Sequence, residues 1–571
     1  MLTIRRLYLY AMSGVMLVVL ASGLRLLLSV LLDTLGLAGD PALGGGSTRE
    51  TLSLAGALVG VGLPVWAIHW WLVRRATLGG DAEAEAERAS PIRAAYVSIV
   101  LAVTLAFMAT AAIDVVRSIL QEVLDLRPAY GSIGDPAGSI ATILICGAAW
   151  GFHAWVRRVD LLAGPLSGGA VLWPRLYLYV AQLITLVAMT GAVSGFTNAL
   201  ADRIAAGGVA GFDDYANYTI PSALAVLAVA GALFLAHAVY TLRLVAEPGW
   251  RGESERRSHM RVGYLVILIG AGLSATIGGL GESLRGLLLV LLGAADGSLP
   301  PGGIARATIV PLVVLAPWLG AAVHARYQLL REAGRAPAPG RAAAGTRLDQ
   351  HVRSLVGLGY GAVALAWLLG IALDALIGGD RYALGSGGRA FDLASFLPNA
   401  ILGLAVWALA WARVTASRVA NPDAEASSGI RRAALLAVLG AGLAASVGSA
   451  AFILYRVFGS ALGVVGGPGV ASELASAMGI LVVAAAVALY HGLVVREDVR
   501  ARAHPTDTTA AGIPVDLPSR AVPATPPPAG GERPLVLHAD PGVDLDAALA
   551  AARAALPPGA HLVDARQPPT Q

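Results

Sequence analysis

Hydrophobic and polar positions alternate in long blocks along this chain, and each hydrophobic block is long enough for a helix of several turns. Twelve such runs lie between Leu7 and Val495, separated by short segments that carry most of the charged residues. A helix needs roughly 20 mostly apolar residues to cross the ~30 Å hydrocarbon core of a bilayer. The pattern therefore predicts an all-α, polytopic membrane protein with about 12 transmembrane helices.

The twelve runs form a hairpin that recurs six times, and the hairpins pair into a larger unit of four helices. Arg6-Leu-Tyr-Leu-Tyr10 returns word for word as Arg175-Leu-Tyr-Leu-Tyr179, two hairpins later. Other residues also occupy matching positions, namely Arg117, Arg285 and Arg456 in the even hairpins and Arg25, Asn198 and Asp374 in the odd ones. Because each block has an even number of spans, its copies keep one topology and are parallel repeats.

This periodicity divides the chain into three membrane repeats followed by a different C-terminal part. We expect four-helix repeats at residues 1–160, 161–332 and 348–500. Residues 501–534 are rich in proline and predict a disordered linker. Residues 535–571 predict a small cytoplasmic α/β module, with short strands around 535–538 and 561–564 and a helix between them. A unit of this size rarely folds alone, so it would dock on a partner.

Composition and charge agree with burial in lipid and indicate an orientation. Hydrophobic residues make up 56% of the chain and charged residues 14%. All 41 basic residues are arginine, and 27 of them lie before odd helices or after even ones. By the positive-inside rule, both termini are expected in the cytoplasm, with the chain in a bacterial inner membrane. The net charge of +4 thus belongs to cytoplasmic loops and does not imply nucleic-acid binding.

Three local motifs connect the chain to a known family. They are the Arg6-Leu-Tyr-Leu-Tyr10 opening, the long leucine-rich first helix, and the ending Trp66-x-x-His69-x-x-x-x-Arg74-Arg75. With them the chain resembles a bacterial family of multi-pass membrane proteins catalogued as a domain of unknown function, a four-helix domain repeated in tandem. The third block departs from the pattern, because it lacks the opening tyrosines and has Trp411 at one histidine position. The resemblance implies an architecture and no activity.

One histidine lies near the end of almost every even helix: His69, His153, His237, His324 and His491. Histidines at one depth on several helices could ligate a haem or relay protons. We favour a third reading, in which they join the neighbouring tryptophans in the interfacial belt, because one histidine per hairpin is inherited with the repeat. We therefore expect no cofactor. The single cysteine, Cys146, has no metal-ligand spacing around it, and no metal site is expected.

Ionisable and polar residues inside the odd helices form a candidate intramembrane network: Arg25, Asp114, Arg117, Asn198, Glu282, Arg285, Asp374 and Arg456. Acid precedes base by three residues in Asp114/Arg117 and Glu282/Arg285, which predicts ion pairs on one helix face. Arg117 lies 24 residues beyond Arg93, about 36 Å along a helix, and so near the outer interface.

Two interpretations of this network stay open. The favoured one is that these residues hold helix ends at the outer surface, and the alternative is a polar pathway or ligand cavity there. Arg25 and Asp374 have no local partner, and we hypothesise that they pair with each other across the first and third repeats.

The functional expectation is correspondingly coarse. The sequence contains no nucleophile motif, metal box or phosphate loop, so we do not expect an enzyme. The favoured function is a structural or sensory membrane scaffold that presents the cytoplasmic tail. The alternative is a transporter or channel for an unknown solute, and a haem-binding protein is the weaker third. Expected partners are the lipid bilayer and, through the tail, a second copy or a cytoplasmic protein.

Overall fold

Long helices account for nearly all of the structure, and the part of the chain that the structure describes contains no strand. The computed structural model describes residues 2–37, 48–79, 82–126, 135–163, 168–206, 212–292, 303–334, 341–377, 388–463 and 469–503. Twelve helices in these ranges are long and apolar enough to cross a membrane, which confirms the number expected from the sequence. The proposed linker and α/β tail module lie outside the described residues.

Each repeat contains four long helices and one short helix that connects the second to the third. The first repeat comprises α1 (Leu2–Leu32), α2 (Thr48–Arg75), α3 (Ala82–Arg88), α4 (Pro91–Val123) and α5 (Pro136–Ala163), with a short π-helical turn, η1 (Asp33–Leu37), after α1. The second comprises α6 (Gly169–Ala206), α7 (Phe212–Ala246), α8 (Trp250–Arg256), α9 (His259–Leu291) and α10 (Gly303–Gly334). The third comprises α11 (Arg341–Leu376), α12 (Gly388–Ala420), α13 (Pro422–Ala426), α14 (Gly429–Ala461) and α15 (Val470–Ala503).

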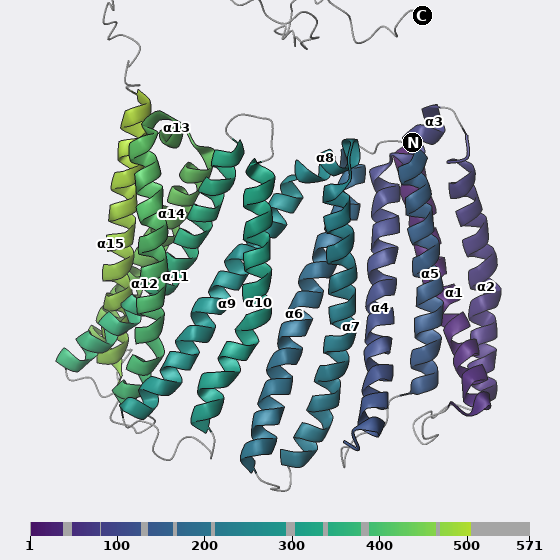
Figure 1. Cartoon of the computed structure of the whole chain (residues 1–571), viewed down its shortest axis with the longest axis horizontal. Coiled ribbons are helices and arrows are strands. Elements are labelled where there is room, and N and C mark those ends of the chain that lie inside the picture. Colours follow the sequence, from purple (N-terminus) through teal and green to yellow (C-terminus); the bar gives the residue numbers. More distant parts are fainter. Residues whose placement is uncertain are drawn as a thin grey trace, which may run out of the picture. The chain divides into compact units, whose positions relative to one another are not determined.

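The long helices lie side by side and alternate in direction, and α3, α8 and α13 lie at the same end as the N-terminus (Figure 1). We call this end, where α1, α4, α6, α9, α11 and α14 begin, the arginine-rich end. The third helix of each repeat begins there after a serine, and Ser258 and Ser428 accept a hydrogen bond from the backbone N–H three residues later. A side-chain oxygen in this position satisfies one of the free amides of the first turn. The helix therefore begins at the same point in each repeat.

The repeats follow one another as an open series. Within the first repeat, α1 packs against α2, α4 and α5. The first repeat meets the second where α4 packs against α6 and α7, and the second meets the third where α9 packs against α11 and α12. Among the described helices these main contacts do not join α1 to α11, and the repeats therefore form an open series and not a ring.

Glycines allow a close helix crossing between α11 and α12. A Cβ at Gly403 would lie 2.9 Å from the carbonyl oxygen of Gly357 and in collision with the amide nitrogen of Gly361. Small residues let helices approach closely where apolar surroundings provide no hydrophobic driving force between them. Gly357, Gly361 and Gly403 therefore serve packing within the chain.

Candidate functional site

The first helix of each repeat is tied to the short connecting helix by an arginine and a buried glutamate. The glutamates on α3, α8 and α13 are at most 8% exposed. The ion pairs are Arg6–Glu87 (2.5 Å), Arg175–Glu255 (2.8 Å) and Arg347–Glu425 (2.5 Å). Each pair fixes the connecting helix against the start of the repeat.

A second buried ion pair joins the third helix of each repeat to the end of the fourth. The pairs are Arg93–Asp160 (2.8 Å), Arg261–Glu332 (2.5 Å) and Arg431–Asp498 (2.7 Å). The three guanidinium side chains are at most 5% exposed. Buried charges of this kind are tolerated only with a partner of opposite charge and good hydrogen-bond geometry. The six pairs, two in each repeat, thus hold the helices of that repeat together at the arginine-rich end.

In the first repeat a tyrosine connects the two ion pairs. The Tyr10 hydroxyl donates to Glu87 Oε1 at 2.9 Å, and Arg93 Nη1 donates to the same hydroxyl at 3.2 Å. Tyr179 donates to Glu255 in the second repeat, and buried His351 takes the equivalent position in the third. We call Arg6, Glu87, Tyr10, Arg93 and Asp160 the first-repeat network.

The connecting helix α8 also carries exposed charges, which behave differently from the buried ones. Glu253 accepts hydrogen bonds from Arg256 and Arg257, and these bonds lower the pKa of its carboxyl below the ordinary value. Arg256 additionally donates to the Val245 carbonyl at 2.6 Å and so holds the preceding turn. In the first repeat Arg88 does the same with the carbonyl of Thr77, at 2.7 Å.

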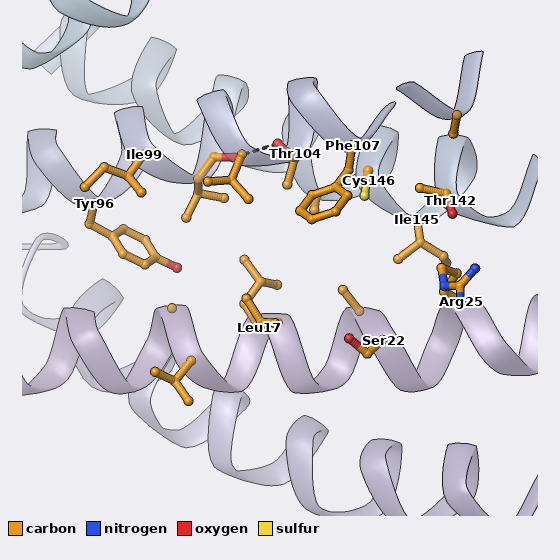
Figure 2. A pocket seen from close by; sticks show the side chains of 18 of the residues that line it. Leu17, Ser22, Arg25, Tyr96, Ile99, Thr104, Phe107, Thr142, Ile145 and Cys146 are labelled. Atoms are coloured by element: carbon orange, nitrogen blue, oxygen red, sulfur yellow. Dashed lines mark hydrogen bonds between the residues drawn. The ribbon is translucent and has the colours of Figure 1, made fainter. Parts of the chain in front are cut away.

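A large cavity lies between α1, α4 and α5, directly beside the first-repeat network. Its volume is about 960 Å³, at the upper end of the range for small-molecule sites. Tyr10 and Tyr96 line one end, and Arg25, Asp114 and Asp135 line the other. Figure 2 shows Tyr96 and Arg25 at opposite ends, with the apolar side chains of α1 and α4 pointing into the space between them. The cavity is therefore mainly apolar along its length, with tyrosines at one end and charged residues at the other.

Arg25 supplies the positive charge of this cavity. Its side chain is half-buried and makes no hydrogen bond or ion pair within the described part of the chain. Asp114 pairs with Arg117 at 2.9 Å, and Asp135 accepts a hydrogen bond from the Gly138 amide at 2.8 Å. A Cβ at Gly138 would lie 3.3 Å from Arg25 Nη1 and would collide with Asp135 Oδ2, so the Asp135 carboxylate lies near the guanidinium without a hydrogen bond to it. The hydrogen-bond donors of Arg25 are therefore unused among the described residues.

The cavity opens sideways between α1 and α4. Val15, Val18, Ile99, Val103 and Phe107 line it and are between 43% and 60% exposed. These side chains present apolar surface both to the cavity and to the surroundings of the helices. A molecule with a long apolar part could therefore enter from the side of the helix row without passing through either end.

The third repeat has a hollow at a corresponding place, between α11, α14 and α15. Its volume is about 620 Å³, and its lining includes Trp367, Phe452, Ser472, Glu473 and Ser476. Glu473 is ion-paired with an arginine of α14 and so is not free. The two cavities thus differ in polarity although the same three helices of the repeat form them.

The local ion pairs expected inside the odd helices are present. Asp114 pairs with Arg117 and Glu282 with Arg285 at 2.8 Å, each across three residues of one helix. Each arginine also lies over an aromatic ring of the next repeat, Arg117 over Tyr218 and Arg285 over Phe391. These groups therefore contribute to the junctions between repeats.

The other members of the expected network have separate environments. Asn198 Oδ1 accepts from Arg306 Nε at 3.1 Å, and Arg306 is also ion-paired with Asp202. Arg456 pairs with Glu473 across α14 and α15. The hypothesis that Arg25 pairs with Asp374 is wrong. The carboxylate oxygens of Asp374 have no hydrogen-bond partner. Arg25 is not their partner, because its helix α1 packs within the first repeat.

The repeated histidines are mostly inward-facing hydrogen-bonding groups. His153 and His491 are 0% and 1% exposed, His69 and His237 are half-buried, and only His324 of the five is exposed as a belt residue would be. Nε2 faces a tyrosine hydroxyl in His69–Tyr8 (3.4 Å), His153–Tyr96 (3.2 Å) and His237–Tyr177 (3.1 Å).

The hydrogen bonds also fix the tautomer of these rings. Nδ1 lies 2.7 to 2.8 Å from a backbone carbonyl one turn earlier in His69, His153 and His237. A carbonyl can only accept, so Nδ1 carries the proton and Nε2 accepts from the tyrosine. The described residues hold no group of three or more His, Cys, Asp or Glu arranged for a metal ion. These histidines join helices within the repeat.

The buried ion pairs were not anticipated from the sequence, although a signal for them exists. Arg93 and Asp160 are 67 residues apart, and so are Arg431 and Asp498. A base and an acid that keep one separation in two copies of a repeat indicate contact. The sequence holds no comparable signal for the cavity, because the cavity is a space between the faces of packed helices.

Comparison with known proteins gives the repeats a family. Residues 6–137, 175–320 and 347–486 each match a domain of unknown function, DUF5671. The chain belongs to the DUF5671 family. No curated protein and no solved structure matches it.

The three DUF5671 copies begin at Arg6, Arg175 and Arg347, and this register corrects one correspondence expected from the sequence. Counting 27 residues from each arginine leads to an aspartate, giving Asp33, Asp202 and Asp374. Arg25 and Asn198 are therefore not the counterparts of Asp374. The aspartates are the repeated feature of the first helix, and the surroundings of each differ.

Proposed function

We propose that this DUF5671 protein is a multi-pass protein of a bacterial inner membrane, with both ends in the cytoplasm, that acts as a sensory scaffold. Its first repeat binds one amphipathic molecule, with the apolar chain in the cavity between α1, α4 and α5 and the acidic head on Arg25. The orientation is supported by the arginine bias of the loops. The many large apolar side chains on the outer helix faces support lipid as the surroundings.

The observation that carries the proposal is Arg25 at one end of a mainly apolar cavity. The hydrogen-bond donors of its half-buried guanidinium are unused within the described part of the chain, so an acidic group placed there is stabilised by charge-assisted hydrogen bonds. The distance from Tyr10 to Arg25 is 15 residues of α1, about 22 Å along the helix. That length suits an extended hydrocarbon chain with a carboxylate or phosphate at its end.

The closed end of the cavity favours binding over transport. Tyr10 lines the cavity and is held by Glu87 and Arg93. A solute that continued towards the arginine-rich end would have to separate this buried set of charges, which is strongly unfavourable. A ligand that stays in the cavity instead contacts the network through Tyr10. Its presence can thereby be sensed at the arginine-rich end, where α15 ends at Ala503.

The single cysteine offers a direct test, because Cys146 lines the cavity. Full-length protein in nanodiscs is treated with N-ethylmaleimide in the presence of increasing oleate or oleyl alcohol, which share a chain and differ in charge. We expect oleate to slow the labelling of Cys146 at concentrations about tenfold lower than oleyl alcohol, the effect of one charge-assisted hydrogen bond.

Two variants make the test specific. Arg25→Gln is expected to remove the advantage of oleate while leaving protection by oleyl alcohol unchanged. Arg158→Gln alters an exposed arginine outside the cavity and should behave as the wild type. Equal protection by both molecules in the wild type, or none by either, would overturn the proposal.

A further inference from the structure

Asp374 is a buried carboxylate without a partner in the third repeat. Its residue is 1% exposed, and neither Oδ1 nor Oδ2 has a hydrogen-bond partner. Ser472 on α15 is 2% exposed, and its Oγ is likewise without a partner. Three buried oxygen atoms from two helices thus lack a donor. Burying such groups unsatisfied is unfavourable, especially for a charged carboxylate.

The helix packing places Asp374 and Ser472 opposite each other. A Cβ at Gly370 on α11 would lie 3.0 Å from the Ser476 Cα on α15. Gly479, one turn further along α15, meets Gly370 and Ala366, so the two helices run antiparallel. One turn from Gly370 towards the end of α11 is Asp374, and one turn from Ser476 towards the start of α15 is Ser472. The two side chains therefore lie at the same level of one helix contact.

Comparison with the second repeat shows which charge is missing. There the equivalent aspartate, Asp202, is ion-paired with Arg306 of α10. Arg306 lies 18 residues before His324, and in the third repeat the residue 18 before His491 is Glu473. The position that supplies a guanidinium in one copy thus supplies a carboxylate in the other.

The remaining charges near Asp374 do not compensate for this exchange. Glu473 is neutralised by Arg456 on α14. Asp374, Glu473 and Arg456 together carry two negative charges and one positive charge. The negative charge of Asp374 is therefore unbalanced. A positive charge from outside the chain is the missing component.

We infer that Asp374 and Ser472 bind a small monovalent metal cation, Na⁺, which takes the place that Arg306 has in the second repeat. Carboxylate and hydroxyl oxygens are suitable ligands for a hard cation. Ser472 also lines the 620 Å³ hollow, so the hydroxyl side of the site borders a space that an ion can enter. This site is independent of the cavity in the first repeat.

Thermal unfolding of the full-length protein in nanodiscs tests the site. NaCl is raised against choline chloride at constant ionic strength, so that general screening stays fixed. A cation that binds only the folded state raises the unfolding midpoint in a saturable way. We expect this rise in the wild type, its loss in Asp374→Asn, and a shift to about tenfold higher Na⁺ in Ser472→Ala, which removes one ligand.

Asp33→Asn is the matched control, because it changes the equivalent aspartate of the first repeat, which is exposed. This variant should keep the full response to Na⁺. The inference is overturned if the wild type unfolds at the same temperature in both salts, or if Asp374→Asn responds to Na⁺ as the wild type does. Should Asp374→Asn fail to fold, an unchanged Na⁺ dependence in Ser472→Ala overturns it equally.

Discussion

Arg93 holds the carboxylate of Asp160 with two hydrogen bonds, from Nε at 2.8 Å and from Nη2 at 3.0 Å. The two residues are 67 positions apart and lie on α4 and α5. An equivalent pair recurs in both other repeats, so this contact is a property of the four-helix unit. Ion pairs thus join the helices of the DUF5671 repeat at the arginine-rich end, and apolar and small residues pack them along their length.

Removing one partner of this pair should destabilise the protein strongly. Asp160→Ala leaves the Arg93 charge buried, which we expect to lower the free energy of unfolding by about 3–5 kcal/mol. The double variant Arg93→Met/Asp160→Leu removes both charges and should lose much less. Asp114→Ala breaks a more exposed pair and should change stability by less than about 1 kcal/mol. Reversible unfolding in mixed micelles measures all three, and similar losses in the single and double variants would contradict the account.

The connecting helix α3 should depend on its buried glutamate. Glu87→Gln weakens the contacts with Arg6 and Tyr10, and we expect a loss of about 1.5–3 kcal/mol in unfolding free energy. We also expect faster proteolysis of the segment between α2 and α4, because α3 is held less firmly. Glu85→Gln changes an exposed residue of the same helix and serves as the control. Identical cleavage rates in the two variants would argue against the role of Glu87.

The crossing of α11 and α12 should tolerate no added methyl group. Gly403→Ala places a Cβ against the backbone of α11, and we expect a destabilisation of about 1–3 kcal/mol from overpacking. Gly359→Ala, on the outer side of α11 with open space around it, should be neutral or slightly stabilising. Unfolding midpoints of the two variants compare the sites directly. An equal effect of both substitutions would be inconsistent with the close crossing.

The proposed topology rests on the arginine bias and can be measured without purification. Reporter fusions at the N-terminus and after residue 503 should both be active in the cytoplasm. A fusion after Leu126, in the connection between α4 and α5, should be active only on the other side. Fusions at the two ends that report opposite compartments would contradict both the orientation and the even number of crossings.

The sequence alone predicted the features that depend on the order of residues along one helix. Continuous apolarity gave the twelve helices, and the three-residue spacing of Asp114 and Arg117 gave their ion pair. The repeat of Arg6 at Arg175 led to a tandem repeat, and the DUF5671 matches likewise recur three times along the chain. Each of these features follows from helix periodicity or from similarity between copies, and neither requires knowledge of which helix faces meet.

Features that depend on facing helices were not predictable from one sequence. The partner of Glu87 is 81 residues away, and the sequence does not state which face of α3 turns inward. His153 was expected in the interfacial belt, yet it is buried against Tyr96, because a histidine on an apolar helix suits either environment. Arg25 was recognised as unusual, but the cavity beside it exists only as the gap between three packed helices.

The most direct test of the central claim is equilibrium binding of radiolabelled oleate to the full-length protein in nanodiscs. Wild-type protein should bind one oleate saturably. Arg25→Gln should bind it about tenfold more weakly, as expected for the loss of one charge-assisted hydrogen bond. Ala21→Trp, which fills the cavity, should abolish binding, and Arg158→Gln should leave it unchanged. Binding that is unaffected by both Arg25→Gln and Ala21→Trp would contradict the account.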